Sequence, residues 1–322
     1  MSFALYVIRY KIMATLYTQQ DRNVRKTWLF MFVFLVLIVG LGWFLSYYYG
    51  NPFILYFAVI FSVLANIGSY WWSDKIVLAM TRARQIQESD NQVLWNVVEN
   101  LSITAGLPMP RIYIVDDPAP NAFATGRNKE HAAVAVTTGL LSMLDRSELE
   151  GVIAHELSHV GNRDILISTI VVVLAGLVVM LSDFFLRSHM WGGGRSRGGG
   201  KGNQLQGILF LVGIIFAVLS PIIATLIRLA ISRKREFLAD ASGALLTRYP
   251  EGLARALQKI SQYGGRMQRA SNATAHLFIS NPFGPDKNGQ IGFMQKLFMT
   301  HPPMQERVRA LLGDKMQNRV EL

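Results

Sequence analysis

The sequence contains no cysteine among its 322 residues. Disulfide bonds and thiolate metal ligands are therefore excluded, and any bound metal ion must be held by histidine, aspartate or glutamate. Charged residues are also few, at 16% of the chain, whereas apolar residues make up 51%. Because the apolar residues are concentrated in long runs, this composition argues against a simple soluble protein and favours a membrane protein.

The formal net charge of +11 raises the question of nucleic-acid binding. Much of this charge lies in short basic clusters next to apolar runs, at residues 22–26, 82–84 and 233–235. Such clusters are typical of membrane proteins that face anionic lipid. No nucleic-acid recognition motif accompanies them. We therefore expect a lipid bilayer as a partner and no nucleic acid.

Two apolar runs near the N-terminus, residues 28–49 and 53–72, are each long enough for a helix to span the hydrocarbon core. Asn51 and Pro52 leave room only for a short turn between them, so residues 28–72 are predicted to form a transmembrane hairpin. Residues 1–27 carry no small-residue cleavage site after a short apolar core. They are predicted to be a cytoplasmic segment and not a cleaved signal.

A second predicted hairpin, residues 165–231, contains apolar runs at 165–186 and 208–231 joined by a glycine-rich loop. The basic residues of the loop favour a cytoplasmic position for it, whereas the cluster at 233–235 places the opposite end of the pair there. A true hairpin, a shallow re-entrant pair and two apolar helices packed on the soluble part are all compatible with this pattern. Length favours the true hairpin, which makes about four transmembrane helices in all.

Residues 73–164 and 232–322 are predicted to form the two parts of a mixed α/β domain. Helical spacing of apolar residues predicts a helix over 91–106. Short runs of β-branched and small residues predict strands over 111–116 and 132–137.

His155, Glu156 and His159 form the pattern His-Glu-x-x-His. On a helix, residues four apart lie on one face, so both imidazoles can bind one ion. A catalytic zinc site needs three protein ligands and one open position for water, whose proton Glu156 would take and pass to the leaving amine. Ser147 and Glu150 fit the capping box of a helix that begins just before the motif. The sequence therefore predicts a zinc metalloendopeptidase with one Zn²⁺ per chain.

The third ligand must come from elsewhere in the chain. Asn162 and Ile165 stand where a metzincin has a glycine and a histidine, so that family is excluded. Glu236 stands out among the later glutamates because Asp240 follows it by one helical turn. From there Asp240 could accept the N–H of a ligating histidine and fix its tautomer. His276 is the other conceivable ligand.

These features resemble the HtpX-type membrane proteases of peptidase family M48, which also includes the CAAX prenyl proteases. The resemblance rests on the His-Glu-x-x-His helix, the later helix with Glu236 and Asp240, the two leading spans, and segments at 121–126, 133–137 and 301–307. It implies a mostly α membrane protein with a zincin-like (gluzincin) mixed α/β metalloprotease domain. It further implies Glu236 as the third zinc ligand, an active site facing the cytoplasm at a bacterial inner (plasma) membrane, and unfolded or damaged membrane proteins as substrates.

Several further residues are predicted to contact the substrate. Ala133 and Ala135 lie in a small-residue strand, and metalloproteases commonly bind an extended substrate along an exposed edge strand. A buried central strand is the alternative. Asn121 is expected to anchor the adjoining loop. The resemblance suggests that His301 and Arg307 donate to the oxyanion of the tetrahedral intermediate; otherwise Arg307 would be a solvated residue on a polar helix face.

Two other functions fit part of the sequence. A site-2-type intramembrane protease has the same motif, but inside an apolar span and with an aspartate in another span, for which Asp183 is the only candidate. Polar residues at 146–148 and 162–164 instead place the motif helix at or outside the membrane surface. A non-catalytic membrane scaffold that keeps a metal site would not need Glu156. Self-association is compatible with each of these functions.

Overall fold

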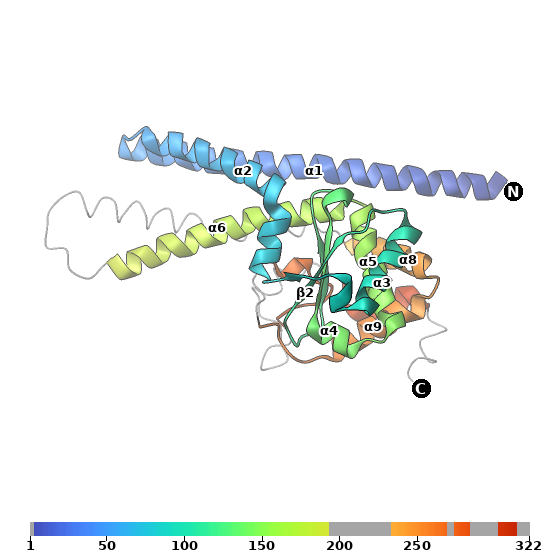
Figure 1. Cartoon of the computed structure of the whole chain (residues 1–322). Coiled ribbons are helices and arrows are strands. Elements are labelled where there is room, and N and C mark those ends of the chain that lie inside the picture. Colours follow the sequence, from blue (N-terminus) through green and yellow to red (C-terminus); the bar gives the residue numbers. More distant parts are fainter. Residues whose placement is uncertain (1–2, 193–232, 269–273, 284–301, 314–322) are drawn as a thin grey trace.

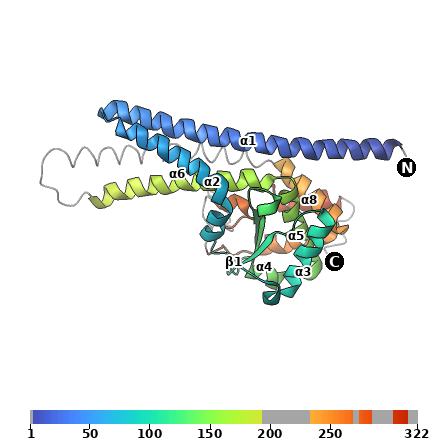
Figure 2. The same cartoon turned by 45° about the horizontal axis from the view of Figure 1, so that its top comes forward.

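Three long helices run side by side and extend together from one side of a body of shorter helices and a small sheet (Figures 1 and 2). They are α1 (Phe3–Tyr49), α2 (Phe53–Met80) and α6 (Asp164–Gly192). The N-terminal part of α1 continues over that body to its other side. This computed structural model describes residues 3–192, 233–268, 274–283 and 302–313. The architecture confirms the predicted mostly α membrane protein with a mixed α/β domain.

The body combines a four-stranded sheet with helices that come from both sides of the predicted second hairpin. Its elements are β1 (Arg84–Gln85), η1 (Glu88–Asp90), α3 (Gln92–Ala105), β2 (Arg111–Val115), β3 (Ala122–Thr125), η2 (Lys129–His131), β4 (Ala133–Thr137), α4 (Thr138–Met143), α5 (Arg146–Gly161), α8 (Arg233–Thr247), α9 (Pro250–Gln262), η3 (Ala275–Leu277) and α11 (Met304–Leu312).

The long helices have the length and composition of membrane spans. Among the described residues, Gln20–Tyr49, Phe53–Met80 and Asp164–Leu181 are each apolar enough to cross a bilayer. Only 28% and 22% of the apolar windows of α1 and α2 are buried, against 67% in α6. The hairpin of α1 and α2 therefore leaves most of its apolar surface to lipid, while α6 packs inside the protein. The fourth predicted span, 208–231, and the glycine-rich loop lie outside the described residues.

Close packing holds the hairpin together and joins it to the body. A Cβ atom on Gly42 of α1 would lie 2.2 Å from the Cβ of Ala58 on α2, so glycine is needed for this approach. At the body end of α2, Asp74 accepts a hydrogen bond from Arg111 of β2 at 2.6 Å. α1 begins well before the predicted start of its span at residue 28: residues 3–27 belong to the same helix.

The sheet has the order β1-β2-β4-β3, with β2 and β4 parallel and the outer pairs antiparallel. β4 is therefore an interior strand, with hydrogen-bonded neighbours on both sides. Val134 and Val136 on one face of it belong to a core cluster shared with α3, α5 and α9, while Ala133 and Ala135 on the other belong to a cluster shared with α6 and Phe278. The predicted exposed edge at 132–137 is wrong, and the buried central strand is correct; the edge beside α5 is β3.

Helix boundaries follow local capping chemistry. The predicted helix at 91–106 is confirmed: the Asn91 side chain caps α3, and Gly106 ends it in the left-handed conformation, with φ of +65°. For α5, however, the predicted N-cap at Ser147 is wrong. Asp145 accepts from the backbone N–H of Glu148, whose side chain accepts from the backbone N–H of Asp145 in return. The capping box therefore begins two residues earlier than predicted.

Candidate metal centre and active site

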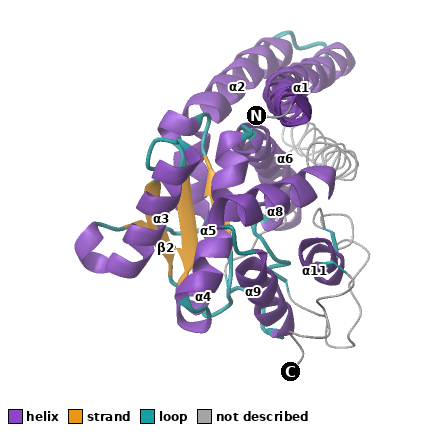
Figure 3. Ribbon diagram, turned by 90° about the vertical axis from the view of Figure 1, so that its right-hand side faces the viewer, coloured by secondary structure: helices purple, strands orange, loops and turns teal. Residues whose placement is uncertain are grey.

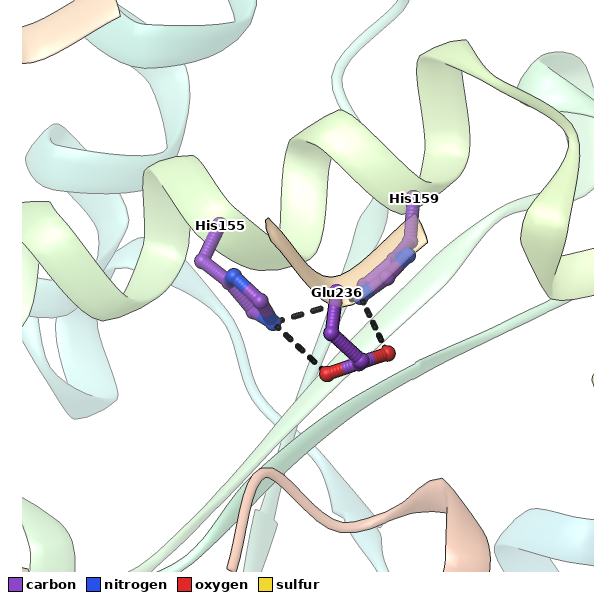
Figure 4. A group of neighbouring side chains, drawn as sticks. All are labelled: His155, His159 and Glu236. Atoms are coloured by element: carbon purple, nitrogen blue, oxygen red, sulfur yellow. Dashed lines mark hydrogen bonds and ion pairs between the residues drawn. The ribbon is translucent and has the colours of Figure 1, made fainter. Parts of the chain in front are cut away.

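The two histidines of the motif lie one turn apart on α5, and their imidazole rings face the same point (Figure 4). Their Nε2 atoms are 3.2 Å apart. The His155 side chain is 1% exposed and that of His159 is 15% exposed, so His159 is the less buried of the two.

The third predicted ligand, Glu236, reaches this point from α8, which packs along α5 (Figures 3 and 4). Its Oε2 atom is 3.9 Å from Nε2 of His155, and its Oε1 atom is 3.6 Å from Nε2 of His159. Zinc bonds of about 2.0–2.2 Å in a tetrahedral arrangement place ligand atoms roughly 3.3–3.6 Å apart. The three residues, whose ligand atoms all lie within 4.8 Å of one another, therefore suit a zinc-sized ion.

The hydrogen bonds of the other ring nitrogens fix which atoms face this point. Nδ1 of His155 lies 2.9 Å from Oδ1 of Asp240, and Nδ1 of His159 lies 3.0 Å from Oδ2 of Asp164. An ionised carboxylate only accepts, so each Nδ1 carries the proton, and in a neutral ring each Nε2 carries a lone pair. Two ring nitrogens this close to each other and to the Glu236 carboxylate favour a cation between them. This donor set fits a divalent metal ion.

Glycine allows α8 to approach α5 so closely. Glu236, Asp240 and Gly243 are spaced four and three residues apart and share the face of α8 that packs on α5. A Cβ atom on Gly243 would lie 3.0 Å from the backbone nitrogen of His155. The small residue at this position therefore lets the two carboxylates upstream reach the histidines.

Asp240 supports His155, as predicted, and is itself held by Arg307. The guanidinium donates through Nε at 2.8 Å and through Nη2 at 2.6 Å, a two-pronged contact with one carboxylate. Burial raises the pKa of Asp240, but the hydrogen bond and charge of Arg307 outweigh it and lower the pKa to about 2. Arg307 is 0% exposed, so the solvated alternative for it is wrong. The structure gives it a positioning role, and its oxyanion role stays a prediction.

Asp164, the first residue of α6, is the supporting residue that the sequence analysis missed. Burial lowers the pKa of His159, but the hydrogen bond to Asp164 and the charges of Glu236, Asp164 and Glu156 outweigh it and raise the pKa to about 9. Arg163 adopts φ of +57° and turns the chain between α5 and α6, which brings Asp164 back to the ring. An acidic residue opening an apolar run directly after the motif was the available signal.

Glu156, the predicted general base, is 3% exposed and lies on α5 next to the first ligand. Its charge contributes to the raised pKa of His159. A carboxylate this close to the shared point of the three ligands can accept a proton from a water molecule there.

Asn121 anchors a segment that is distant in the sequence and not the adjoining loop, and its predicted substrate contact stays a prediction. Its amide donates to the backbone oxygen of Ser280 at 3.2 Å and accepts from the backbone nitrogen of the same residue at 3.2 Å. Ala133 and Ala135 are 0% exposed on the interior strand β4, so their main-chain groups are not available to an extended substrate. Their predicted role in substrate binding is wrong for this physical reason.

Two of the predicted residues are outside the part of the chain that the structure describes. His301 lies in the undescribed segment 284–301, so its oxyanion role stays a prediction. The backbone of His276 belongs to η3, but its side chain is outside the described part as well. The ligand set of the described residues is therefore His155, His159 and Glu236.

Comparison with known proteins identifies the family of this chain. The family model of peptidase family M48 matches residues 88–315. The chain is 48% identical over 299 residues to "Protease HtpX homolog" of Caldanaerobacter subterraneus subsp. tengcongensis, which covers 92% of this chain and 97% of the relative. It is also 48% identical over 296 residues to the protein of that name from Tropheryma whipplei, with the same coverage.

Among solved structures, the crystal structure of S. mikatae Ste24p is similar with a TM-score of 0.47 and 18% sequence identity. The likeness covers 91% of this chain and 66% of that chain, so this chain spans about two thirds of its length. The family match covers most of the chain, and relatives nearly half identical to it extend over almost all of it. This membrane metallopeptidase therefore belongs to peptidase family M48.

Proposed function

We propose that this protein is a zinc-dependent endopeptidase whose metal is held by His155, His159 and Glu236. The observation that carries the proposal is the convergence of these three side chains from two helices, with the Nε2 atoms of the two histidines 3.2 Å apart and all ligand atoms within 4.8 Å of one another. When bound, a zinc ion would polarise the scissile carbonyl and make a water molecule acidic near neutral pH.

The protein's own residues supply the remaining chemistry. Glu156 accepts the proton of the attacking water and then delivers it to the nitrogen of the leaving amine. Asp240 and Asp164 hold the imidazole rings of His155 and His159 in the orientation that presents Nε2 to the metal.

The position of the site supports membrane-protein substrates. Only Asn162 and Arg163 separate the metal-binding helix α5 from the membrane helix α6. The site is therefore near the membrane surface, on the side where α1 carries its basic cluster at residues 22–26. By the positive-inside rule this side is cytoplasmic. We propose an inner-membrane quality-control protease that cuts unfolded or damaged membrane proteins from the cytoplasm.

The test of the mechanism compares the full-length protein in detergent with its Glu156→Gln variant. We expect the variant to bind zinc as the wild type does but to hydrolyse casein or a fluorogenic peptide at least about 10³-fold more slowly, because the base is lost. Undiminished hydrolysis in Glu156→Gln would show that the proposed mechanism is wrong.

The ligand set is tested by zinc content. Glu236→Ala should lose zinc, whereas His276→Ala should keep it. Zinc retained in Glu236→Ala and lost in His276→Ala would overturn the assignment of the third ligand.

The absence of cysteine makes the orientation in the membrane easy to test. Asn51→Cys lies in the exposed turn between α1 and α2, and Gln262→Cys lies at the exposed end of α9. A membrane-impermeant maleimide should label Asn51→Cys in spheroplasts and Gln262→Cys only after the membrane is opened. The reverse labelling would place the active site outside the cytoplasm.

A further inference from the structure

A buried polar cluster joins the first membrane helix to the metal centre. It consists of Asn23 on α1, Asp164 at the start of α6 and Arg235 on α8, which are 2%, 5% and 7% exposed. The Asn23 amide nitrogen is 2.8 Å from Oδ1 of Asp164, and Nη1 of Arg235 is 3.0 Å from the same oxygen. Nη1 of Arg235 is also 3.0 Å from the amide oxygen of Asn23. Three segments far apart in sequence therefore meet in one set of hydrogen bonds.

One carboxylate oxygen of Asp164 belongs to the buried polar cluster, and the other faces the metal site. Oδ1 accepts from Asn23 and Arg235, while Oδ2 faces Nδ1 of the ligand His159 at 3.0 Å. The plane of the carboxylate is fixed by its Oδ1 partners, and that plane sets the direction from which His159 is held. A carboxylate that lost these partners could rotate and would no longer define the orientation of the ring.

Asparagine suits this position because it both donates and accepts. Its amide serves the carboxylate of Asp164 and the guanidinium of Arg235 at once, and it adds no charge to the buried ion pair. An apolar residue of the same size would leave each charged group one partner short, which is costly for buried charges. Arg235 also directly precedes the ligand Glu236, so the cluster contacts the element that carries the third ligand.

The same stretch of α1 caps the C-terminal end of the metal-binding helix. The side-chain nitrogen of Gln20 donates to the backbone oxygen of Gly161 at 2.7 Å, and that of Asn23 donates to the backbone oxygen of Asn162 at 3.1 Å. Carbonyl groups in the last turn of a helix have no partner within the helix. α1 supplies these partners just beyond His159.

We propose that Asn23 is a positioning residue of the metal centre, so that the first transmembrane helix is part of the active site as well as a membrane anchor. Asn23 acts through Asp164 on His159. The inference rests on the proposed zinc site and deepens it. Loss of comparable supporting residues costs about 10–100-fold in metal affinity or activity.

The test uses the full-length protein in detergent and compares Asn23→Leu with Thr27→Val. Thr27 is the matched control because it is equally buried on the same helix, one turn on, and its hydroxyl donates to the backbone oxygen of Asn23 at 2.9 Å and not to Asp164. The measurements are zinc affinity by competition with a chromophoric chelator, the visible absorption spectrum of the Co²⁺-loaded protein, and thermal unfolding of the metal-free protein.

We expect Asn23→Leu to bind zinc about 10–100-fold more weakly and to show an altered Co²⁺ spectrum, with Thr27→Val like the wild type. Because Asn23 acts through Asp164, the double variant Asn23→Leu/Asp164→Asn should bind zinc no more weakly than Asp164→Asn alone. Asn23→Ser, which keeps a small polar group, supplies the same comparison if Asn23→Leu does not fold.

Two outcomes would overturn the proposal. One is a lower unfolding temperature of the metal-free Asn23 variant with zinc affinity and Co²⁺ spectrum unchanged. The contact of Asn23 would then stabilise the packing of α1 on the protein without positioning the metal centre. The other is full additivity of the Asn23 and Asp164 substitutions. A wild-type protein that binds no zinc would instead contradict the proposed function itself, so the two failures are distinguishable.

Discussion

The closeness of α8 to α5 leads to a prediction about a residue that touches neither metal nor substrate. In Gly243→Ala, the added methyl group would lie 3.0 Å from the backbone nitrogen of His155 and 3.3 Å from its Cα. Carbon atoms in ordinary contact are about 3.5–4.0 Å apart. The helices must therefore separate by a few tenths of an ångström, because the atoms met are backbone atoms that cannot rotate away.

The separation matters more for the metal than for the fold. Alanine gains up to about 1 kcal/mol over glycine inside a helix, whereas overpacking costs about 1–3 kcal/mol, so the net loss of stability is about 0–2 kcal/mol. Metal–ligand distances, in contrast, tolerate shifts of only about 0.2 Å. Moving Glu236 by a few tenths of an ångström relative to His155 should therefore weaken zinc binding about tenfold or more, which corresponds to at least about 1.4 kcal/mol.

Two measurements separate the effect on zinc binding from the effect on stability. They are zinc affinity by chelator competition and thermal unfolding of the metal-free protein. Gly161→Ala is the matched control, since it adds the same methyl group to α5 near His159 and meets only Cδ1 of Leu107, at 3.9 Å. We expect Gly161→Ala to bind zinc normally. If Gly243→Ala also bound zinc with wild-type affinity, helix spacing would not set the ligand geometry and the reasoning would be refuted.

Two further predictions concern the stability of α5. Gly151→Ala places a methyl group 2.6 Å from the backbone nitrogen of Leu253 on α9; it should lower the free energy of unfolding by about 1–3 kcal/mol in thermal or denaturant unfolding, and unchanged stability would contradict the close packing. Asp145→Ala should cost about 1 kcal/mol at neutral pH and Ser147→Ala much less, because Asp145 caps the helix. The backbone hydrogen bond from Glu148 lowers the pKa of Asp145, so its contribution is present above the unfolded pKa of about 3.9 and is lost as pH falls through the lowered value. Equal effects of the two substitutions, or an Asp145 effect that persists in acid, would contradict this capping.

The sequence was most informative where the chemistry is local. His155 and His159 are one helical turn apart, and so are Glu236 and Asp240, so spacing alone predicts that each pair shares a helix face. Long apolar runs likewise predict α1, α2 and α6, because a bilayer sets their length.

The misplaced cap of α5 shows where a local pattern is degenerate. Asp145 with Glu148 and Ser147 with Glu150 both fit the capping-box spacing. Only the structure shows which backbone N–H groups are free at the start of the helix.

Contacts between segments that are distant in the chain could not be predicted from the sequence. Asn23 and Asp164 are 141 residues apart, and nothing in either segment indicates the other. Arg307 looks like a surface residue on a polar helix until α11 is placed against Asp240. The order of the strands also depends on the whole fold, so the sequence could not distinguish an edge from an interior position for β4.

The contact between Asn23 and Asp164 also fixes how far the active site lies from the membrane-spanning part of α1. It places Asp164, whose other oxygen holds the ligand His159, beside Asn23, and the apolar run of α1 starts five positions later, at Trp28. At about 1.5 Å per helical residue, this support of the metal centre lies only about 7 Å along α1 from the start of the apolar run. An extended peptide covers that distance with two or three residues. A membrane-anchored substrate could therefore be cut within a few residues of its own transmembrane segment, without being pulled from the bilayer.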